Sequence, residues 1–267
     1  MRTQLQRGII KLLLCSWQAV PNGVRPPEAI LRNMNQNAQI GSNVERLFKN
    51  TIGKQSNVLT ILKARFGIKG NFAKAFSTGT DAGKSDVILR FTNATLGANI
   101  KAFKAGFNQL TRLTIQSFCR EFGLVQLQPI FEKGAVRVAG KAGRFIAESD
   151  EQMIISKLNP LGPKIVHFAL ARTENPELLV LYDRNNMQMH IYDLPLILTS
   201  LDYSITISPR GVIRIGKYIT IQRKGGNGVH SAHIPKTSLS HPGNNLQIKM
   251  TVGSFVSEVA PIASYSA

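Results

Sequence analysis

The sequence of 267 residues contains 33 Lys and Arg against 15 Asp and Glu, which gives a formal net charge of +18. Hydrophobic residues make up 43% of it, which excludes an intrinsically disordered chain and is ordinary for a folded one. A fold does not need this excess of positive charge, because like charges repel one another in the compact state, so a polyanionic partner is expected.

The positive charge gathers in long stretches that contain no acidic residue. No Asp or Glu occurs between Asp86 and Glu121, and none occurs between Asp202 and Glu258. Both stretches combine Lys and Arg with patterned apolar residues, whereas basic tails are usually of low complexity. We therefore expect a shaped basic cleft formed by folded sequence, of the kind that binds nucleic acid.

The first 80 residues predict helices interrupted by turns. A helix is expected to begin near Asn43, because Ser-Asn-Val-Glu at 42–45 is a capping box that ends in Glu45. The apolar run at 9–14 is too short to span a bilayer and lacks a signal-peptide cleavage site, so an amphipathic helix is expected and no membrane partner. Cys15 and Cys119 have neither disulfide nor metal-ligand spacing, which favours reduced thiols in a cytoplasmic protein.

Beyond residue 80 the pattern changes to short segments of strand character, and a helical period returns at 107–122. A boundary near residue 127 divides the chain into an α/β half at 1–127 and a β-rich half at 128–267. No linker composition marks this boundary, so the two halves are expected to share one core. The predicted strands lie at 86–91, 98–103, 165–171, 177–182, 187–192, 205–207, 212–215, 218–221 and 246–250.

The first two predicted strands bring three polar residues together. A hairpin that pairs Phe91 with Ala98 places Asp86 and Lys101 diagonally on one face of the sheet. Asn99 shares this face with Lys101, because side chains along a strand alternate with a period of two. The sequence therefore collects a carboxylate, an amide and an ammonium group at one place.

Hydrolysis of a phosphodiester uses such a set of groups. Carboxylate and carbonyl oxygens bind Mg²⁺, which polarises a phosphoryl oxygen and lowers the pKa of a bound water molecule. A neighbouring ammonium group can position that water and offset the negative charge of the transition state. The alternative is a plain cross-strand ion pair between Asp86 and Lys101, worth less than about 1 kcal/mol at a surface.

A family resemblance favours the catalytic alternative. The sequence Gly-Lys-Ser-Asp at 83–86, followed by Asn-Ile-Lys at 99–101, resembles the active-site motif of PD-(D/E)XK nucleases. It is most similar to that of the MspI-like group of monomeric type II restriction endonucleases, which cut GCGC or CCGG. This group tolerates an amide, here Asn99, where most of the superfamily has Asp or Glu. Further segments resemble the group in the same order, at 41–48, 106–109, 207–211, 220–226 and 246–249.

The resemblance implies roles for the residues of the motif. Asp86 would bind the metal ion, Asn99 and the main-chain carbonyl of Ile100 would contribute to its shell, and Lys101 would act on the attacking water. Glu45 would be a further catalytic residue, although its place in the capping box also explains it fully. Ser85 would steady the phosphate or the Asp86 carboxylate.

The resemblance also implies which residues bind DNA. Arginine, lysine and glutamine have the donors and acceptors that contact base edges in the major groove, and paired glycines let the backbone approach the duplex. For part of the set the alternative is a basic surface that holds phosphates without contacting bases. The expected DNA-binding residues are Asn108, Gln109, Ser208, Arg210, Arg223, Lys224, Gly225, Gly226, Gln247 and Lys249.

Together these features predict an α/β fold. It would contain a PD-(D/E)XK nuclease core, with a mixed sheet flanked by helices at 1–127, and a β-rich DNA-recognition half at 128–267. The expected function is that of a Mg²⁺-dependent type II restriction endonuclease from the cytoplasm of a prokaryotic cell. It would cut double-stranded DNA at a short GC-only sequence, and a GCGC-like sequence is favoured. A monomer with one active site is expected, and a transient dimer on DNA stays open. The alternatives are a non-enzymatic basic nucleic-acid-binding protein and a structure-directed nuclease.

Overall fold

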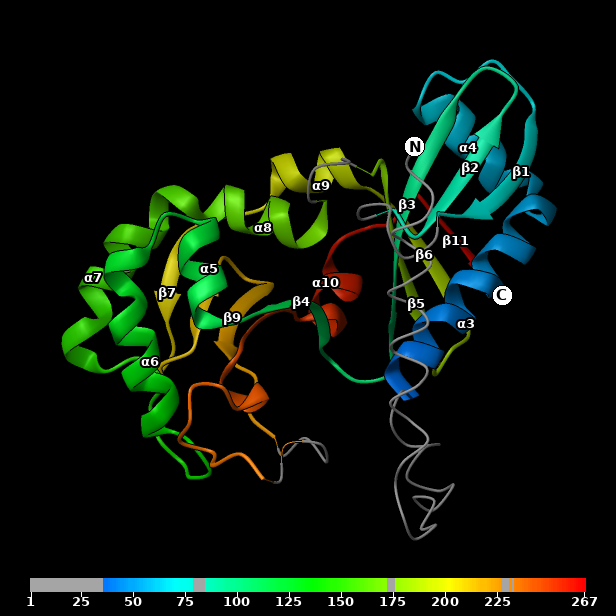
Figure 1. Cartoon of the computed structure of the whole chain (residues 1–267). Helices are drawn as coiled ribbons and strands as arrows, with labels where there is room; N and C mark the ends of the chain where they lie inside the picture. Colours follow the sequence, from blue (N-terminus) through cyan, green and yellow to red (C-terminus); the bar gives the residue numbers. More distant parts are fainter. Residues whose placement is uncertain (1–35, 79–84, 172–175, 227–230, 232) are drawn as a thin grey trace, which may run out of the picture. The chain divides into compact units, whose positions relative to one another are not determined.

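The structure, a computed structural model, describes residues 36–78, 85–171, 176–226, 231 and 233–267 (Figure 1). By its internal contacts the chain divides between Gln39 and Ile40, and Ile40–Ala267 form one compact unit. Apart from the first residues of α3, every element below belongs to this unit. The helix predicted at 9–14, and Cys15 with it, lie outside the described residues.

Six strands form a mixed sheet in the order β1-β2-β3-β5-β6-β11. All neighbours are antiparallel except β3 and β5, which run parallel from Ala98 beside Leu178 to Phe103 beside Asp183. The strands are β1 (Phe72–Ser77), β2 (Val87–Phe91), β3 (Thr95–Phe103), β5 (Leu178–Asp183), β6 (Gln188–Asp193) and β11 (Ala263–Ser266).

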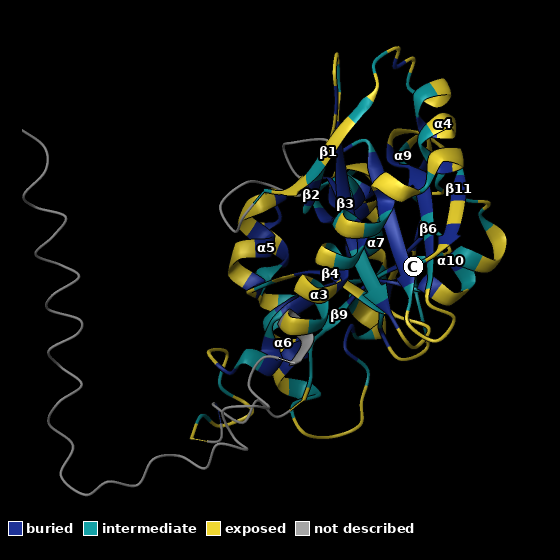
Figure 2. Cartoon of the chain, turned by 90° about the vertical axis from the view of Figure 1, so that its right-hand side faces the viewer, coloured by how far each residue is buried: buried dark blue, intermediate teal, exposed yellow. Residues whose placement is uncertain are grey.

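The two faces of this sheet pack into different apolar clusters. Leu96, Ala98 and Ile100 of β3 belong to the same apolar cluster as residues of α3 (Gln36–Thr51) and α4 (Ser56–Arg65). Phe103 of β3 and Leu181 of β5 belong instead to a larger cluster that includes helices from the middle of the chain. Figure 2 shows the central strands as buried, whereas β1 at the edge is half-buried or exposed throughout. The central strand β3 is thus fixed from both sides.

A second sheet of five antiparallel strands has the order β4-β10-β9-β8-β7. One face of it carries Ile205, Ile213, Ile221 and Ile248, which belong to the larger cluster together with the surrounding helices. The strands are β4 (Asn108–Leu113), β7 (Ile205–Ile207), β8 (Ile213–Ile215), β9 (Ile219–Arg223) and β10 (Leu246–Met250). The helices are α5 (Ile115–Glu121), α6 (Gln128–Arg137), α7 (Glu151–Leu158), α8 (Gly162–Leu170), α9 (Leu194–Ser200) and α10 (Val252–Glu258).

The expected α/β fold, a mixed sheet flanked by helices, is confirmed. The two sheets do not follow the predicted boundary at residue 127, however. Strands β5, β6 and β11 from the second part of the chain complete the first sheet, whereas β4 from the first part is an edge strand of the second. Residues 128–170 are mainly helical, so the second part is less rich in strands than predicted.

Three local predictions are wrong for identifiable reasons. Residues 165–171 belong largely to helix α8, not to a strand, because a short run of apolar residues fits either structure equally well. Residues 108–113 form β4, and the helix predicted at 107–122 begins only at Ile115, after Thr114 caps it by accepting a hydrogen bond from the Ser117 amide. Helix α3 runs through Asn43 instead of beginning there, and the Asn43 side chain accepts a hydrogen bond from Arg46.

Candidate functional site

The candidate site lies where the chain enters β2 beside the middle of β3. In this hairpin Val87 pairs with Ala98 and Arg90 with Thr95, so the connection is shorter than predicted. The predicted pairing of Phe91 with Ala98 is wrong by four residues. Because four is an even number, the shift leaves the predicted faces unchanged. It moves Asp86 away from Phe103, and the Asp86 amide donates to the carbonyl of Ala98 over 2.8 Å.

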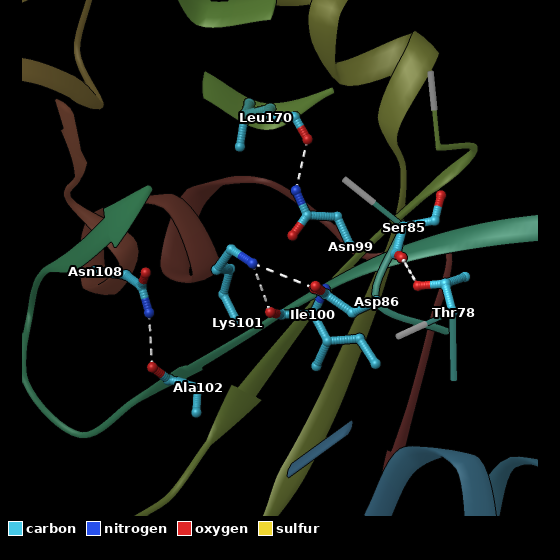
Figure 3. A network of polar contacts seen from close by, with 9 residues as sticks. All are labelled: Thr78, Ser85, Asp86, Asn99, Ile100, Lys101, Ala102, Asn108 and Leu170. Atoms are coloured by element: carbon cyan, nitrogen blue, oxygen red, sulfur yellow. Dashed lines mark hydrogen bonds and ion pairs between the residues drawn. The ribbon is translucent and has the colours of Figure 1, made fainter. Parts of the chain in front are cut away.

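Asp86, Ile100 and Lys101 converge on one point (Figure 3). Oδ2 of Asp86 accepts hydrogen bonds from the Ile100 amide at 2.6 Å and from Nζ of Lys101 at 3.3 Å. The same ammonium group donates to the carbonyl oxygen of Ile100 at 2.8 Å. The side chain of Asp86 is 26% exposed and that of Lys101 is 18% exposed, so a substrate or an ion can reach them. The structure thus joins Asp86 and Lys101 as the sequence predicts.

Asn99 is fully buried and connects β3 to the end of α8. Its Nδ2 donates to the carbonyl oxygen of Leu170 at 2.5 Å, which fixes the orientation of the amide. Its Oδ1 is buried and has no hydrogen-bond partner among the described residues. A buried acceptor without a partner costs about 1–3 kcal/mol, so such an atom usually has a water molecule or an ion beside it. Asn99 therefore both holds the strand and presents an acceptor.

Glu45 of α3 carries a carboxyl group that is affected by the charges of Asp86 and Lys101. Partial burial raises the pKa of its carboxyl group, the negative charge of Asp86 raises that pKa further, and the positive charge of Lys101 lowers it. The capping role that the sequence offered for Glu45 is absent, because α3 begins upstream of it.

The site and its surroundings offer oxygen atoms of the kinds that bind Mg²⁺. They comprise the carboxylates of Asp86 and Glu45, the main-chain oxygen of Ile100 and the partnerless Oδ1 of Asn99. Mg²⁺ is usually held by one or two carboxylates and keeps several water molecules, so it needs no larger cluster of acids. In the part of the chain that the structure describes, no group of three or more His, Cys, Asp or Glu residues could hold a metal ion.

Ser85 is buried beside the Asp86 site and packs on β3 instead of contacting the Asp86 carboxylate. A Cβ atom built on Gly97 would lie 2.4 Å from the Ser85 hydroxyl, so this close contact requires glycine. The Gly97 amide donates to Oε2 of Glu177 at 2.5 Å. Glu177 was not expected in this place, since nothing in the sequence predicts that β5 starts beside Gly97. Its carboxylate links the beginnings of β3 and β5 behind the site.

The second sheet has a polar face opposite its apolar one. The register pairs Gln247 with Arg112 and Gln222, and Lys249 with Gln109 and Thr220. Arg214 of β8 pairs with Thr220 and therefore extends the same face. Gln109, Arg112 and Arg214 are exposed, so the face is accessible and basic.

The comparisons with known proteins bear on the fold. No protein-family model matches the chain, and no curated protein matches it. A solved structure of the restriction endonuclease MspI in complex with its cognate DNA is similar, with a TM-score of 0.50 and 12% sequence identity. The similarity covers 93% of this chain and 100% of that one. The chain has a restriction-endonuclease-like fold.

In this fold the predicted DNA-binding residues of β4 and β10 differ in accessibility. Gln109 is exposed, whereas Gln247 is 4% exposed and donates to the carbonyl of Lys224 at 3.2 Å. Nζ of Lys249 lies 5.8 Å from the centre of the exposed Phe107 ring, and partial burial lowers the pKa of Lys249. Asn108 donates to the carbonyl of Ala102 at 2.6 Å and so closes the connection between β3 and β4.

Hydrogen bonds to main-chain amides and carbonyls fix the two turns that were predicted to bind DNA. The Ser208 hydroxyl accepts a hydrogen bond from the Val212 amide at 3.1 Å, and Arg210 is exposed in the same β7–β8 turn. The amides of Lys224 and Gly225 donate to Asn245 and Gly243. Gly225 and Gly226 have φ angles of 69° and 76°, which only glycine adopts readily. Arg223 pairs with Leu246, so it lies on the face opposite Gln247, apart from the other predicted base-contacting residues.

No helix of the described part of the chain is both long and apolar enough to cross a membrane.

Proposed function

We propose that this chain is a Mg²⁺-dependent endonuclease that cuts double-stranded DNA at a short GC-only sequence, as type II restriction enzymes do. The observation that carries the proposal is the convergence of Asp86, Lys101 and the Ile100 carbonyl on one accessible point of a restriction-endonuclease-like fold. An ion pair with a purely structural role needs no lysine bonded to a main-chain oxygen beside it, no second carboxylate nearby and no partnerless buried amide. In this proposal the six-stranded sheet, which contains β2 and β3, is the PD-(D/E)XK core.

The oxygen atoms of Asp86, Glu45, Ile100 and Asn99 would hold the Mg²⁺ ion. When bound, the ion polarises the phosphoryl oxygen and lowers the pKa of a coordinated water molecule. The Ile100 amide and Lys101 fix the Asp86 carboxylate in one orientation. Lys101 also supplies a positive charge that orients the attacking water and offsets the charge that develops on the phosphate.

Recognition of the sequence would rest on the polar face of the second sheet and the β7–β8 turn. Arg and Lys donate to O6 and N7 of guanine, which makes a GC-only site the natural match for Arg210 and Lys249. Gln109, exposed at the edge strand β4, adds an amide that can contact a base edge. Arg112 and Arg214 flank these residues and can hold phosphates, which position the duplex without specifying its sequence. Within the residues that the structure describes, one such face accompanies one site, which suits the proposed monomeric enzyme.

Incubation with a plasmid tests this proposal. The protein is expected to produce discrete fragments with Mg²⁺ and none with a chelator, and Asp86→Asn should abolish cutting. Asp150→Asn is the matched control, because Asp150 makes no capping bond at the start of α7 and lies outside the site.

The other outcomes separate the alternatives. A smear or nicked circles would favour a nuclease directed by DNA structure, and an unchanged plasmid that is nevertheless bound would favour a non-enzymatic binding protein. Fragments produced equally well by Asp86→Asn would show that the active site has been misplaced.

A further inference from the structure

A basic pocket lies at the end of β9, on the side of the second sheet that faces away from Gln247 and Lys249. Arg223 is the last residue of β9, and its pairing with Leu246 directs its side chain to the same side as Ile221. There it lines a pocket of about 300 Å³ together with Lys141 and Lys236. None of the described residues that line this pocket is acidic. The three cationic side chains therefore line one pocket, which is separate from the polar face that carries Gln247 and Lys249.

A single buried amide builds this pocket. Oδ1 of Asn244 accepts a hydrogen bond from Nε of Arg223 at 2.6 Å. Nδ2 of Asn244 donates to the carbonyls of Lys236 at 2.9 Å and of Ser238 at 2.6 Å. Asn244 is 1% exposed, so these bonds are shielded from water. One side chain thus fixes both the guanidinium group of Arg223 and the backbone that carries Lys236, and it leaves the two terminal nitrogens of the guanidinium outside this bond.

Glycines shape the wall of the pocket. Gly140 and Gly226 both line it and have φ angles of 75° and 76°, where a side chain would be strained. A Cβ atom on Gly140 would lie 3.0 Å from Cδ and 3.7 Å from Nζ of Lys236. The stem of Lys236 therefore lies across Gly140, and this brings its ammonium group to the pocket. A backbone without side chains leaves room for a ligand between the three cations.

The charge of the pocket selects the chemistry of its ligand. Partial burial lowers the pKa of Arg223, which means that the positive charge there lacks part of its hydration. A neutral base edge brings no negative charge to these three cations, whereas a backbone phosphate does, and Arg and Lys are the usual phosphate-binding residues of proteins. The guanidinium group, fixed through Nε, presents its terminal nitrogens as a fork that matches two phosphate oxygens.

We propose that the pocket formed by Arg223, Lys141 and Lys236 binds a backbone phosphate of the DNA duplex. Arg223 then anchors the duplex without reading its sequence, unlike Lys249 on the opposite face. This proposal rests on the proposed function only in taking DNA as the ligand, and it does not depend on cutting.

The test measures binding without Mg²⁺, so it works even if the protein does not cut. The probes are duplexes of equal length that contain GCGC, CCGG or neither, titrated at several salt concentrations. The first variant, Lys141→Met with Lys236→Met, removes two exposed side chains and leaves the bonds of Asn244 intact. The second is Arg223→Gln, and the control is Lys157→Met, an exposed residue of α7.

Both pocket variants are expected to bind all three duplexes about tenfold more weakly, as expected for a lost charge-assisted contact. The slope of log K against log salt should become shallower by about 0.9 for the lost phosphate contact. Lys157→Met should change neither quantity measurably.

Three results would overturn the proposal. A loss confined to the GCGC or CCGG duplex at unchanged salt slope would make Arg223 a base-contacting residue. Unchanged binding of every duplex by both variants would show that the pocket does not touch DNA. Stabilisation of the wild type by millimolar phosphate that both variants lose, with DNA binding intact, would assign the pocket to a small anion.

Discussion

Replacement of Lys101 by methionine separates catalysis from stability. The substitution keeps the length of the side chain and removes the ammonium group that contacts Asp86 at 3.3 Å and the Ile100 carbonyl at 2.8 Å. Asp86 keeps its bond from the Ile100 amide, so its carboxylate retains one partner. Because both side chains are partly exposed, the lost ion pair is worth no more than about 1 kcal/mol. The melting temperature should therefore fall by only about 2–4 °C.

The expected effect on cutting is much larger. Removal of one preorganised group that stabilises the developing charge typically lowers kcat by about 10²–10³-fold. A stability loss near 1 kcal/mol leaves almost all of a protein folded, since the free energy of unfolding is usually about 5–15 kcal/mol. A loss of that size in the cutting rate therefore cannot come from unfolding.

The assay follows plasmid cleavage at saturating enzyme, together with the melting temperature and DNA binding of the same preparation. Lys157→Met removes one positive charge from an exposed position and serves as the control for net charge. Binding should stay within a few-fold of that control, while cutting falls by about two orders of magnitude or more. A Lys101→Met protein that cuts at the wild-type rate would refute the proposed active site.

Three further predictions follow from the structure. Glu45→Gln should raise the melting temperature at pH 8 without metal and reduce the stabilisation by Mg²⁺. Because the pKa of Glu45 is raised in the folded state, the wild type loses stability as the pH rises from the pKa of the unfolded state through that of the folded state. Equal melting curves of the two proteins from pH 4 to pH 8, with and without Mg²⁺, would contradict this. Gly211→Ala should destabilise the protein by more than about 1 kcal/mol in a denaturant titration, since φ is 70° and a Cβ atom would lie 2.5 Å from the Ile146 amide; an unchanged midpoint would show that the turn rearranges freely. Lys249→Met should cost about 1–3 kcal/mol of preference for the cut sequence over random duplex in competition binding, and an equal loss on both would make Lys249 a phosphate contact.

The sequence predicted the active-site pair better than the detailed hairpin. Alternation of side chains assigns Asp86, Asn99 and Lys101 to one region whether the turn has three residues or more, as long as the shift in register is even. The exact register depends on the turn at 92–94, whose residues fit several conformations. Glu45 could be predicted only by the resemblance, because its approach to Asp86 depends on where α3 lies against the sheet.

Other features depend on long-range packing that no local pattern reveals. The segment 165–171 is apolar apart from His167, a pattern that fits a strand or a helix, and in the structure it packs into the larger apolar cluster as part of α8. Asn244 lies in a polar loop of ordinary composition, yet it is nearly fully buried and organises the pocket around Arg223. The resemblance grouped Arg223 with the other expected DNA-binding residues, and the sequence does not show which face of the sheet it occupies, because strand pairing decides that.

The position of β3 between β2 and β5 has a consequence for the order of synthesis. β2 is made just before β3 and can pair with it at once, whereas β5 emerges from the ribosome only after β4, α5, α6, α7 and α8. Contacts between segments so far apart form late, because the intervening chain must first be ordered. Until then β3, which carries Asn99 and Lys101, has an open edge. The proposed cutting activity, which needs Lys101 in place on β3, is therefore expected only after β5 has been synthesised.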